Sequence, residues 1–164
     1  MLIGILSDTH DNLTMIARAL SEYRARGVDA LVHAGDFVSP FAMQFMVKSE
    51  LPIVAVFGNN DGEKEGLKQV CEDIFNEPHR FELAGRTIVL THTPEVLSKV
   101  LEAGDDLGIC GHTHSAEISV GPPLVVNPGE TCGWLSGRST GVIVELTDLS
   151  AELIEFGRQE IPTI

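Results

Sequence analysis

Short apolar runs rich in β-branched residues alternate with segments of helical periodicity over the first two thirds of the chain. The runs lie at 2–6, 30–34, 52–57, 87–91 and 107–110. Between the first two runs, apolar residues recur at the spacing of one helix face, at Leu13, Ile16, Ala17 and Leu20. Strands that alternate with helices predict βαβ units and a parallel sheet, so we expect an α/β fold.

Capping and periodicity signals predict the helices of this region. Asp11 or Asn12 can cap the first helix, and a hydroxyl residue followed by proline begins two others, at 39–40 and 93–94. A further amphipathic helix is predicted over residues 67–74. Its apolar stripe consists of Leu67, Val70, Cys71 and Ile74.

The remaining segments predict strands and turns. Residues 80–91 are expected to form a hairpin that is broken at Ala84-Gly85, and residues 116–157 contain strands separated by turns. These turns are predicted at 121–123, 127–129 and 147–150. We expect the region to form a mixed, partly antiparallel second sheet that packs against the parallel one.

Length and composition limit the class of protein. A chain of 164 residues fits one domain, which we expect to span residues 1–164. No apolar run approaches the ~20 residues of a membrane span, and the N-terminus lacks a basic signal-peptide segment, so we expect a cytoplasmic protein with no membrane partner. The formal net charge of -13 argues against stable nucleic-acid binding, because such binding depends on clustered Lys and Arg. A small anionic substrate stays possible if a bound metal supplies local positive charge.

Polar residues follow all five apolar runs. They are Asp8 and His10, then Asp36, then Asn59 and Asn60, then His92, and last His112 and His114. Because open α/β sheets bind ligands at the carboxyl ends of their strands, we expect these side chains to meet in one crevice. Histidine and carboxylate together are ligands of Zn, Mn, Fe or Ni, and the lack of cysteine among them argues against a closed structural zinc site.

Each of these residues has a simpler explanation when it is taken alone. Asp8 and Asp36 can cap the helices that follow them, and His92 can be a hydrogen-bonded core histidine. The stretch Gly58–Glu63 can be only a turn, because Gly and Asn tolerate positive φ. The histidine pair after the fifth run is harder to explain in this way, since two histidines two residues apart in a turn can face the same small volume. We therefore favour a metal site.

Other motifs carry less weight. Residues 137–141 match G-x-S-x-G, but a strand is predicted after them where a nucleophile elbow needs a helix, so we interpret them as a glycine-flanked loop. Asn12-Leu13-Thr14 is a glycosylation sequon without any sign of secretion. Cys71, Cys110 and Cys132 include no CxxC pair and are predicted to be buried or half-buried thiols that bind no metal. The chain has neither GxGxxG nor a Walker A motif, so nothing indicates a nucleotide cofactor.

Taken in order, the strand-end residues resemble the calcineurin-like metallophosphoesterases. The resemblance rests on Asp8-x-His10, Gly35-Asp36, Gly58-Asn59, His92 and Gly111-His112-x-His114. The small size and the Asn127-Pro128-Gly129 segment make the chain similar to the compact, uncapped bacterial and archaeal phosphodiesterases of that superfamily. This resemblance implies a four-layer αββα sandwich and a metal-dependent phosphodiesterase.

The resemblance also implies two divalent metal ions, with Mn2+ or Ni2+ expected and Zn2+ or Fe2+ as alternatives. Asp8, His10, Asp36 and His114 would hold the first ion, and Asp36, Asn59, His92 and His112 the second. Asp36 would bridge the two. A hydroxide held between the ions would then attack a small phosphodiester in line.

Two positions depart from the family pattern. Asn60 stands where phosphatases of the superfamily usually have a histidine, and an amide can hydrogen-bond a phosphate oxygen but cannot donate a proton to a leaving group. We therefore expect Asn60 to contact the substrate, and aryl phosphodiesters to be better substrates than esters with poor leaving groups. At His92-Thr93-Pro94 the family commonly has His-Gly, so the resemblance does not tell which other residues line the rim of the site.

His33 and His79 match no metal position and are expected to pack, whereas Asp61 is expected to orient its neighbours.

Other functions compete with this one. A protein-binding scaffold is the main alternative, because the retromer's small subunit resembles this fold but has an impaired metal site. The chain keeps every metal-ligand position, which favours an enzyme. A nuclease is disfavoured by the acidic charge, and a cyclic-nucleotide phosphodiesterase fits the residues as well as any other phosphodiesterase does. Exposed sheet edges and the loop around Trp134 are compatible with a homo-oligomer.

Overall fold

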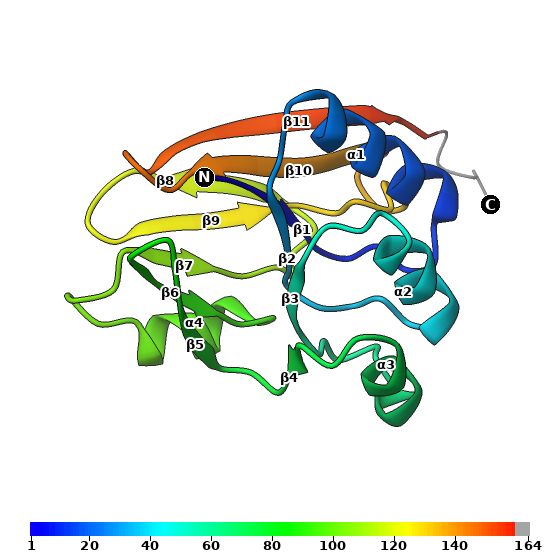
Figure 1. Ribbon diagram of the computed structural model, residues 1–164, viewed down its shortest axis with the longest axis horizontal. Coiled ribbons are helices and arrows are strands. Elements are labelled where there is room, and N and C mark those ends of the chain that lie inside the picture. The colour runs from blue at the N-terminus through cyan, green and yellow to red at the C-terminus, as the bar shows by residue number, and fades with distance from the viewer. Residues whose placement is uncertain (160–164) are drawn as a thin grey trace.

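Two β-sheets lie face to face in the centre of the protein, and helices cover the outer face of each (Figure 1). The structure is a computed structural model that describes residues 1–159; the last residues of the predicted domain, 160–164, lie outside it. Helices α1 (Leu13–Ala25), α2 (Pro40–Val47) and α3 (Lys64–Val70) pack on the first sheet. Helix α4 (Pro94–Val100) packs on the second. The expected αββα sandwich is confirmed.

The first sheet contains six strands in the order β11-β10-β1-β2-β3-β4. They are β1 (Leu2–Leu6), β2 (Ala30–His33), β3 (Ile53–Val56), β4 (Ile74–Phe75), β10 (Arg138–Glu145) and β11 (Ser150–Arg158). Strands β1 to β4 are parallel. Beyond β1 the sheet is extended by β10, which pairs antiparallel with β1, and by β11, which pairs antiparallel with β10.

The second sheet contains five strands in the order β5-β6-β7-β9-β8. They are β5 (His79–Leu83), β6 (Arg86–Leu90), β7 (Leu107–Ile109), β8 (Ala116–Ser119) and β9 (Leu124–Pro128). Strands β6, β7 and β9 are parallel, and β5 and β8 pair antiparallel at the two edges. The hairpin predicted in residues 80–91 is confirmed as β5 and β6.

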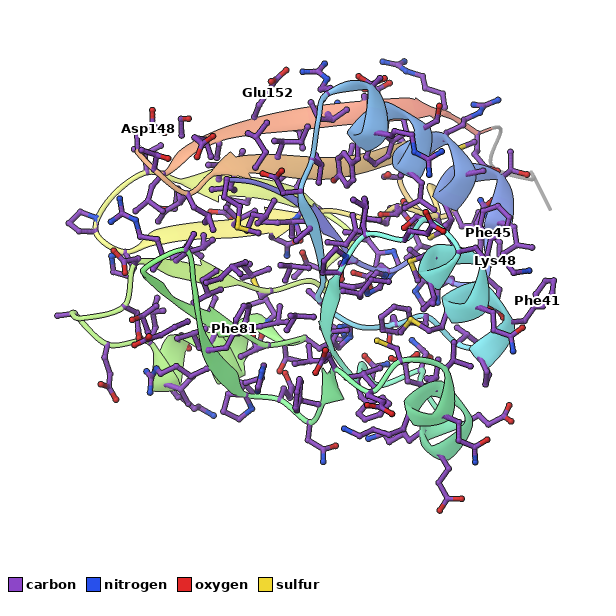
Figure 2. The ribbon with its side chains drawn as sticks, in the orientation of Figure 1. Phe41, Phe45, Lys48, Phe81, Asp148 and Glu152 are labelled. Carbon is purple, nitrogen blue, oxygen red and sulfur yellow. The ribbon has the colours of Figure 1, made fainter. Side chains whose placement is uncertain are left out.

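The predicted helix starts are also confirmed. Asn12 caps α1, because its side-chain oxygen accepts a hydrogen bond from the Met15 backbone N–H at 3.3 Å. Pro40 and Pro94 are the first residues of α2 and α4, where a missing N–H costs no helical hydrogen bond. Helix α2 is apolar on more than its buried face, and Phe41, which is 64% exposed, projects outward from it (Figure 2).

Helix α3 is shorter than the apolar stripe predicts. It ends at Val70, Cys71 has an extended backbone, and Ile74 lies in β4 opposite Ala55 of β3. The prediction of a helix through residue 74 is therefore wrong. Pairing with the open edge of β3 gives the backbone of residues 74–75 hydrogen-bond partners in the sheet, and Ile74 is fully buried there.

The division of residues 116–157 between the sheets also differs from the prediction. Strands β8 and β9 join the second sheet as expected, but β10 and β11 join the first, where β10 pairs with β1. The physical reason is that β10 buries apolar side chains on both faces: Val142 and Val144 pack between the sheets, and Ile143 packs under the helices. Such a strand needs a layer that is covered on both sides.

Two smaller predictions are corrected in the same region. Strand β9 runs through Asn127 and Pro128, so the predicted turn begins only at Gly129. Residues 138–141 lie in β10 and not in a loop. Ser139 is fully buried and donates its hydroxyl to the Thr131 carbonyl oxygen, so it is no nucleophile.

Tyr23 ties helix α1 to the sheet. Its buried hydroxyl donates toward the carbonyl oxygens of Ile5 and Val142, at 2.8 and 3.1 Å. Gly4 and Gly141 make room for it, because a Cβ at either position would overlap the tyrosine side chain. Strands β1 and β10 are thereby held in register beneath α1.

The topology brings six strand ends to one edge of the sandwich. Strands β1, β2 and β3 of the first sheet and β6, β7 and β9 of the second each run parallel within their sheets, and the segments that follow them are hydrogen-bonded to one another both within the second sheet and between the two sheets. Gly111 N–H, after β7, bonds to the carbonyl of His92, after β6, and Thr131 N–H, after β9, bonds to the carbonyl of Ser7, after β1.

Among the helices of residues 1–159, none has the length and apolarity to cross a membrane.

Candidate metal centre

Five of the seven predicted metal ligands have a left-handed backbone. They are Asp8, His10, Asp36, His112 and His114, with φ between 38° and 69°. A non-glycine residue in this region costs roughly 1 kcal/mol or more and persists only where the surrounding structure holds it. The turns after β1, β2 and β7 are therefore strained in the way that functional turns commonly are, even though Asp and His adopt this conformation more readily than most other residues.

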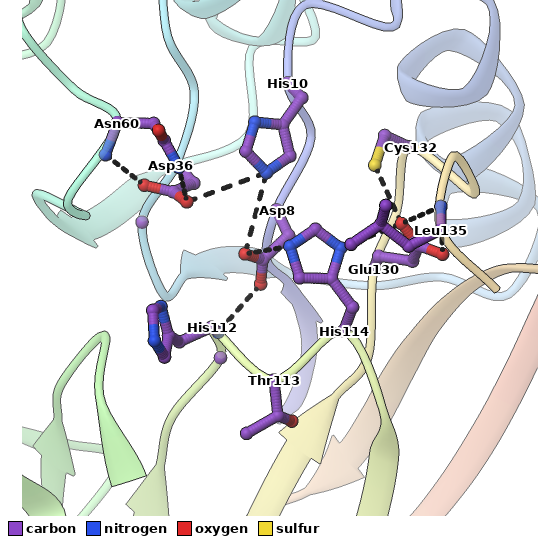
Figure 3. A network of polar contacts seen from close by, with 12 residues as sticks. Asp8, His10, Asp36, Asn60, His112, Thr113, His114, Glu130, Cys132 and Leu135 are labelled. Carbon is purple, nitrogen blue, oxygen red and sulfur yellow. Dashed lines mark hydrogen bonds and ion pairs between the residues drawn. The ribbon is translucent and has the colours of Figure 1, made fainter. Parts of the chain in front are cut away.

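Asp8, His10, Asp36 and His114 form one cluster at this edge (Figure 3). His10 Nε2 lies 3.8 Å from Asp8 Oδ1 and 3.6 Å from Asp36 Oδ2. His114 Nε2 lies 3.4 Å from the same Asp8 oxygen. Asp8 Oδ1 and His10 Nε2 are buried without a hydrogen-bond partner, and buried polar atoms are rarely left so. Converging unpartnered atoms of this kind fit a bound cation.

Asn59, His92 and His112 form a second cluster. The Asn59 amide oxygen lies 2.8 Å from His92 Nε2 and 2.9 Å from His112 Nδ1, and the two ring nitrogens are 3.3 Å apart. His92 Nδ1 lies 2.7 Å from the Ala34 carbonyl oxygen and so carries the proton, which leaves Nε2 with a lone pair. That lone pair faces the Asn59 oxygen, and two acceptors at this distance repel unless a cation lies between them.

Asp36 joins the two clusters. Its Oδ2 is 3.6 Å from His10 Nε2 and 3.5 Å from His92 Nε2. The carboxylate also accepts hydrogen bonds from the backbone N–H of Asn60 at 2.8 Å and from its side-chain amide at 2.7 Å (Figure 3). The structure thus places Asn60 at the site, with its amide directed at the carboxylate that both clusters share.

Asp61 orients the backbone of this region, as expected. Its buried carboxylate accepts hydrogen bonds from the N–H groups of Asp36, Gly58 and Val38 at 2.9, 2.7 and 2.8 Å. These bonds hold the turn after β2 against the turn after β3. Gly58 is required at the contact, because a Cβ there would overlap the Asp36 carboxylate.

Glu130 supports the site and was not among the predicted residues. It follows β9, and its Oε2 accepts a hydrogen bond from His114 Nδ1 at 2.9 Å, which directs His114 Nε2 toward Asp8 (Figure 3). Burial raises the pKa of Glu130, but hydrogen bonds from His114 and Ser136 outweigh it and hold the pKa well below the usual range. The expectation that site residues follow the carboxyl ends of parallel strands also identifies Glu130, once β9 is known to be parallel to β7.

Glu77 is a second supporting carboxylate that the sequence did not indicate. It accepts hydrogen bonds from the backbone N–H groups of His92 and Thr93 at 2.7 and 2.9 Å. The Thr93 hydroxyl also donates to it. Thr93, a departure from the family pattern, therefore lines the rim by anchoring Glu77, and no short motif links two residues so far apart in the chain.

The other histidines and the cysteines lie where packing places them. His33 stacks on Phe37 with ring centroids 3.7 Å apart, and burial lowers its pKa to about 3. His79 stacks on Phe75. All three cysteines are buried and free. Cys132 nevertheless has its sulfur within 4.8 Å of ligand atoms of His10 and His114. The Cys132 thiol donates a hydrogen bond to Glu130 Oε2 at 3.1 Å, and burial raises its pKa.

Comparison with known proteins identifies the family of the chain. Residues 1–149 match the calcineurin-like phosphoesterase superfamily domain. The phosphodiesterase MJ0936 of Methanocaldococcus jannaschii is 39% identical over 149 residues, which cover 85% of this chain and 90% of that protein. A solved archaeal phosphodiesterase superposes with a TM-score of 0.85 at 35% identity, covering 94% of this chain and 99% of the other. The phosphoesterase YfcE of E. coli shares the fold, with a TM-score of 0.70 at 21% identity over 96% of this chain and 100% of its own. The chain belongs to the calcineurin-like phosphoesterase superfamily.

Proposed function

We propose that the protein is a divalent-metal-dependent phosphodiesterase that hydrolyses a small phosphodiester at the edge where the six parallel strands end. The observation that carries the proposal is the pair of buried atoms, Asp8 Oδ1 and His10 Nε2, which face one another without hydrogen-bond partners. Family membership and the names of the relatives, both phosphodiesterases at 35–39% identity, support the same activity.

The residues of the two clusters divide between two ions. Asp8, His10, Asp36 and His114 would hold the first, and Asp36, Asn59, His92 and His112 the second. When bound, two divalent ions neutralise phosphoryl charge and make water a nucleophile at neutral pH. The donor set is nitrogen and oxygen only, which suits Mn2+ or Ni2+ and also admits Zn2+ or Fe2+.

The chain's own residues position these ligands. Ala34 and Glu130 fix the tautomers of His92 and His114, so that Nε2 of each ring faces the site. Asn60 holds the shared Asp36 carboxylate through its backbone and side-chain N–H groups, and we propose that its amide also contacts the substrate. Because that amide cannot donate a proton to a leaving group at neutral pH, we propose aryl or similarly activated phosphodiesters as the preferred substrates.

A metal titration tests the proposal. Protein freed of metal is supplied with Mn2+, Ni2+, Zn2+ or Fe2+ and assayed with an aryl phosphodiester, alongside His92→Ala and the matched control His79→Ala. Activity is expected with at least one metal, to be lost in His92→Ala and kept in His79→Ala, because His79 stacks on Phe75 and Phe81 and belongs to neither cluster. If no metal binds and none supports hydrolysis, the enzyme proposal fails and the protein-binding scaffold is favoured.

Three further predictions stay open to direct measurement. A cytoplasmic location and the absence of stable nucleic-acid binding rest on the sequence and its net charge of -13. A homo-oligomer is compatible with the exposed Phe41 and Phe45 of α2, which lie on the outer surface (Figure 2). The mass of the protein in solution, measured by light scattering, decides the oligomeric state.

A further inference from the structure

The segment between β9 and β10 is folded around Glu130. Its carboxylate accepts hydrogen bonds from the backbone N–H groups of Trp134 at 3.1 Å, of Leu135 at 3.0 Å, and of Ser136. Gly133 and Gly137 enclose this short loop and both have positive φ, at 70° and 74°. Since the same carboxylate holds His114, the loop is fixed to the metal centre through one buried side chain.

This loop places an indole ring beside the site. The ring of Trp134 lies 6.4 Å from that of His10, at an interplanar angle of 25°. His10 in turn lies 5.3 Å from His114, at 19°. Trp134 remains 50% exposed, so part of a large flat surface stays open to solvent next to two predicted metal ligands.

We propose that Trp134 is the specificity-determining residue of the site and binds a flat aromatic substituent, an aryl ring or a nucleobase, of the phosphodiester. This inference rests on the proposed function and narrows its substrate class. Aromatic groups stack in offset, nearly parallel arrangements like the one that Trp134 and His10 already show. Stacking suits a chain of net charge -13, because its contribution to affinity does not depend on attracting an anionic substrate by charge.

The neighbouring Leu135 provides a matched control. It lies in the same loop, its N–H is bound by the same carboxylate, and it is 69% exposed. An alanine at position 135 therefore removes a similarly placed apolar side chain without removing the stacking surface. Trp134→Phe keeps an aromatic ring and should retain part of the preference.

Competitive inhibition of the phosphodiesterase by paired analogues measures the preference. Phenylphosphonate is compared with methylphosphonate, and adenosine 5′-monophosphate with ribose 5-phosphate, so that the two pairs separate simple aryl groups from nucleobases. In at least one pair the aromatic member should bind on the order of tenfold more tightly, as expected for one stacked ring. Trp134→Ala should abolish this ratio and Leu135→Ala should keep it.

Fluorescence gives a readout that is independent of turnover. Trp134 is the only tryptophan of the chain, so its emission reports this ring alone, and the aromatic member of the preferred pair should change it while the other member does not. Equal inhibition ratios in wild type and Trp134→Ala, together with unchanged emission, overturn the inference while leaving a measured phosphodiesterase activity intact. Emission that depends on protein concentration also overturns it, because the ring would then be covered by a second copy of the chain. Absence of all hydrolysis counts against the proposed function instead, and emission then still tests stacking.

Discussion

Replacing Asp61 by alanine should both destabilise the fold and weaken metal binding. The Asp61 carboxylate is the acceptor for three backbone N–H groups, those of Asp36, Gly58 and Val38. Val38 and Asp36 have positive φ, at 81° and 63°. A β-branched residue such as valine is especially strained in this region, so the two turns need the bonds that Asp61 supplies.

The expected magnitude follows from the orphaned donors. Each buried N–H left without an acceptor costs about 1–3 kcal/mol, and water that enters the space vacated by the carboxylate satisfies some of them. We therefore expect Asp61→Ala to lower the free energy of unfolding by about 3–5 kcal/mol. Asp61→Asn keeps one carbonyl oxygen and should cost about half as much.

Urea denaturation in the presence of a chelator measures the stability, and calorimetric titration with Mn2+ measures the affinity of the predicted site. Glu63→Gln is the control, because Glu63 is an exposed acid in the same segment whose side chain makes no capping hydrogen bond. If Asp61→Ala is as stable as Glu63→Gln and binds Mn2+ as the wild type does, Asp61 does not hold these turns and the reasoning is wrong.

Three other changes test separate parts of the structure. Asn60→Ala removes the amide that donates to Asp36 at 2.7 Å and should lower kcat/KM for an aryl phosphodiester by about tenfold. Unchanged kcat and KM would refute the proposed contact of Asn60 with the substrate. Adding a metal at a hundred times its dissociation constant to chelated protein should raise the free energy of unfolding by about 2.7 kcal/mol, seen as a higher Tm, and a constant Tm would contradict binding to the folded state. Tyr23→Phe leaves the carbonyls of Ile5 and Val142 without their shared donor. The free energy of unfolding, measured by urea denaturation, should fall by about 1–2 kcal/mol while metal affinity is unchanged. A decrease below the error of the measurement would show that water replaces the hydroxyl.

The strand ends were predictable because the rule that places ligands there depends on local patterns alone. An apolar run followed by Asp, Asn or His is visible in a single stretch of sequence, and the parallel arrangement of β1, β2 and β3 follows from the intervening helices. The structure brings Asp8, Asp36 and His92 together as that rule predicts.

The supporting carboxylates were not predictable in this way. Glu77 acts on His92, and Glu130 on His114, across separations of 15 and 16 residues. Their roles depend on how two strands and a loop pack, which no short pattern encodes. The prediction of a helix through Ile74 was wrong for a related reason. The spacing of Ile74 fits a helix, but the open edge of β3 offers a strand partner, and pairing in the sheet outweighs local periodicity.

The charges at the site connect its stability to its function. Asp8, Asp36 and Glu130 are buried, and within residues 1–159 the ion pairs they make are all with histidines, not with Lys or Arg. A buried carboxylate costs several kcal/mol unless hydrogen bonds or a positive charge compensate it, and Asp8 Oδ1 has no hydrogen-bond partner. Neutral histidines cannot supply that charge, and protonated ones would lose the lone pairs that face Asp8 and Asp36. Divalent cations satisfy both requirements at once, since they compensate the carboxylates and accept the histidine lone pairs. Under the proposed metal binding, substitution of a ligand in the strained turns after β1 and β2 should therefore lower metal-dependent stability and activity together.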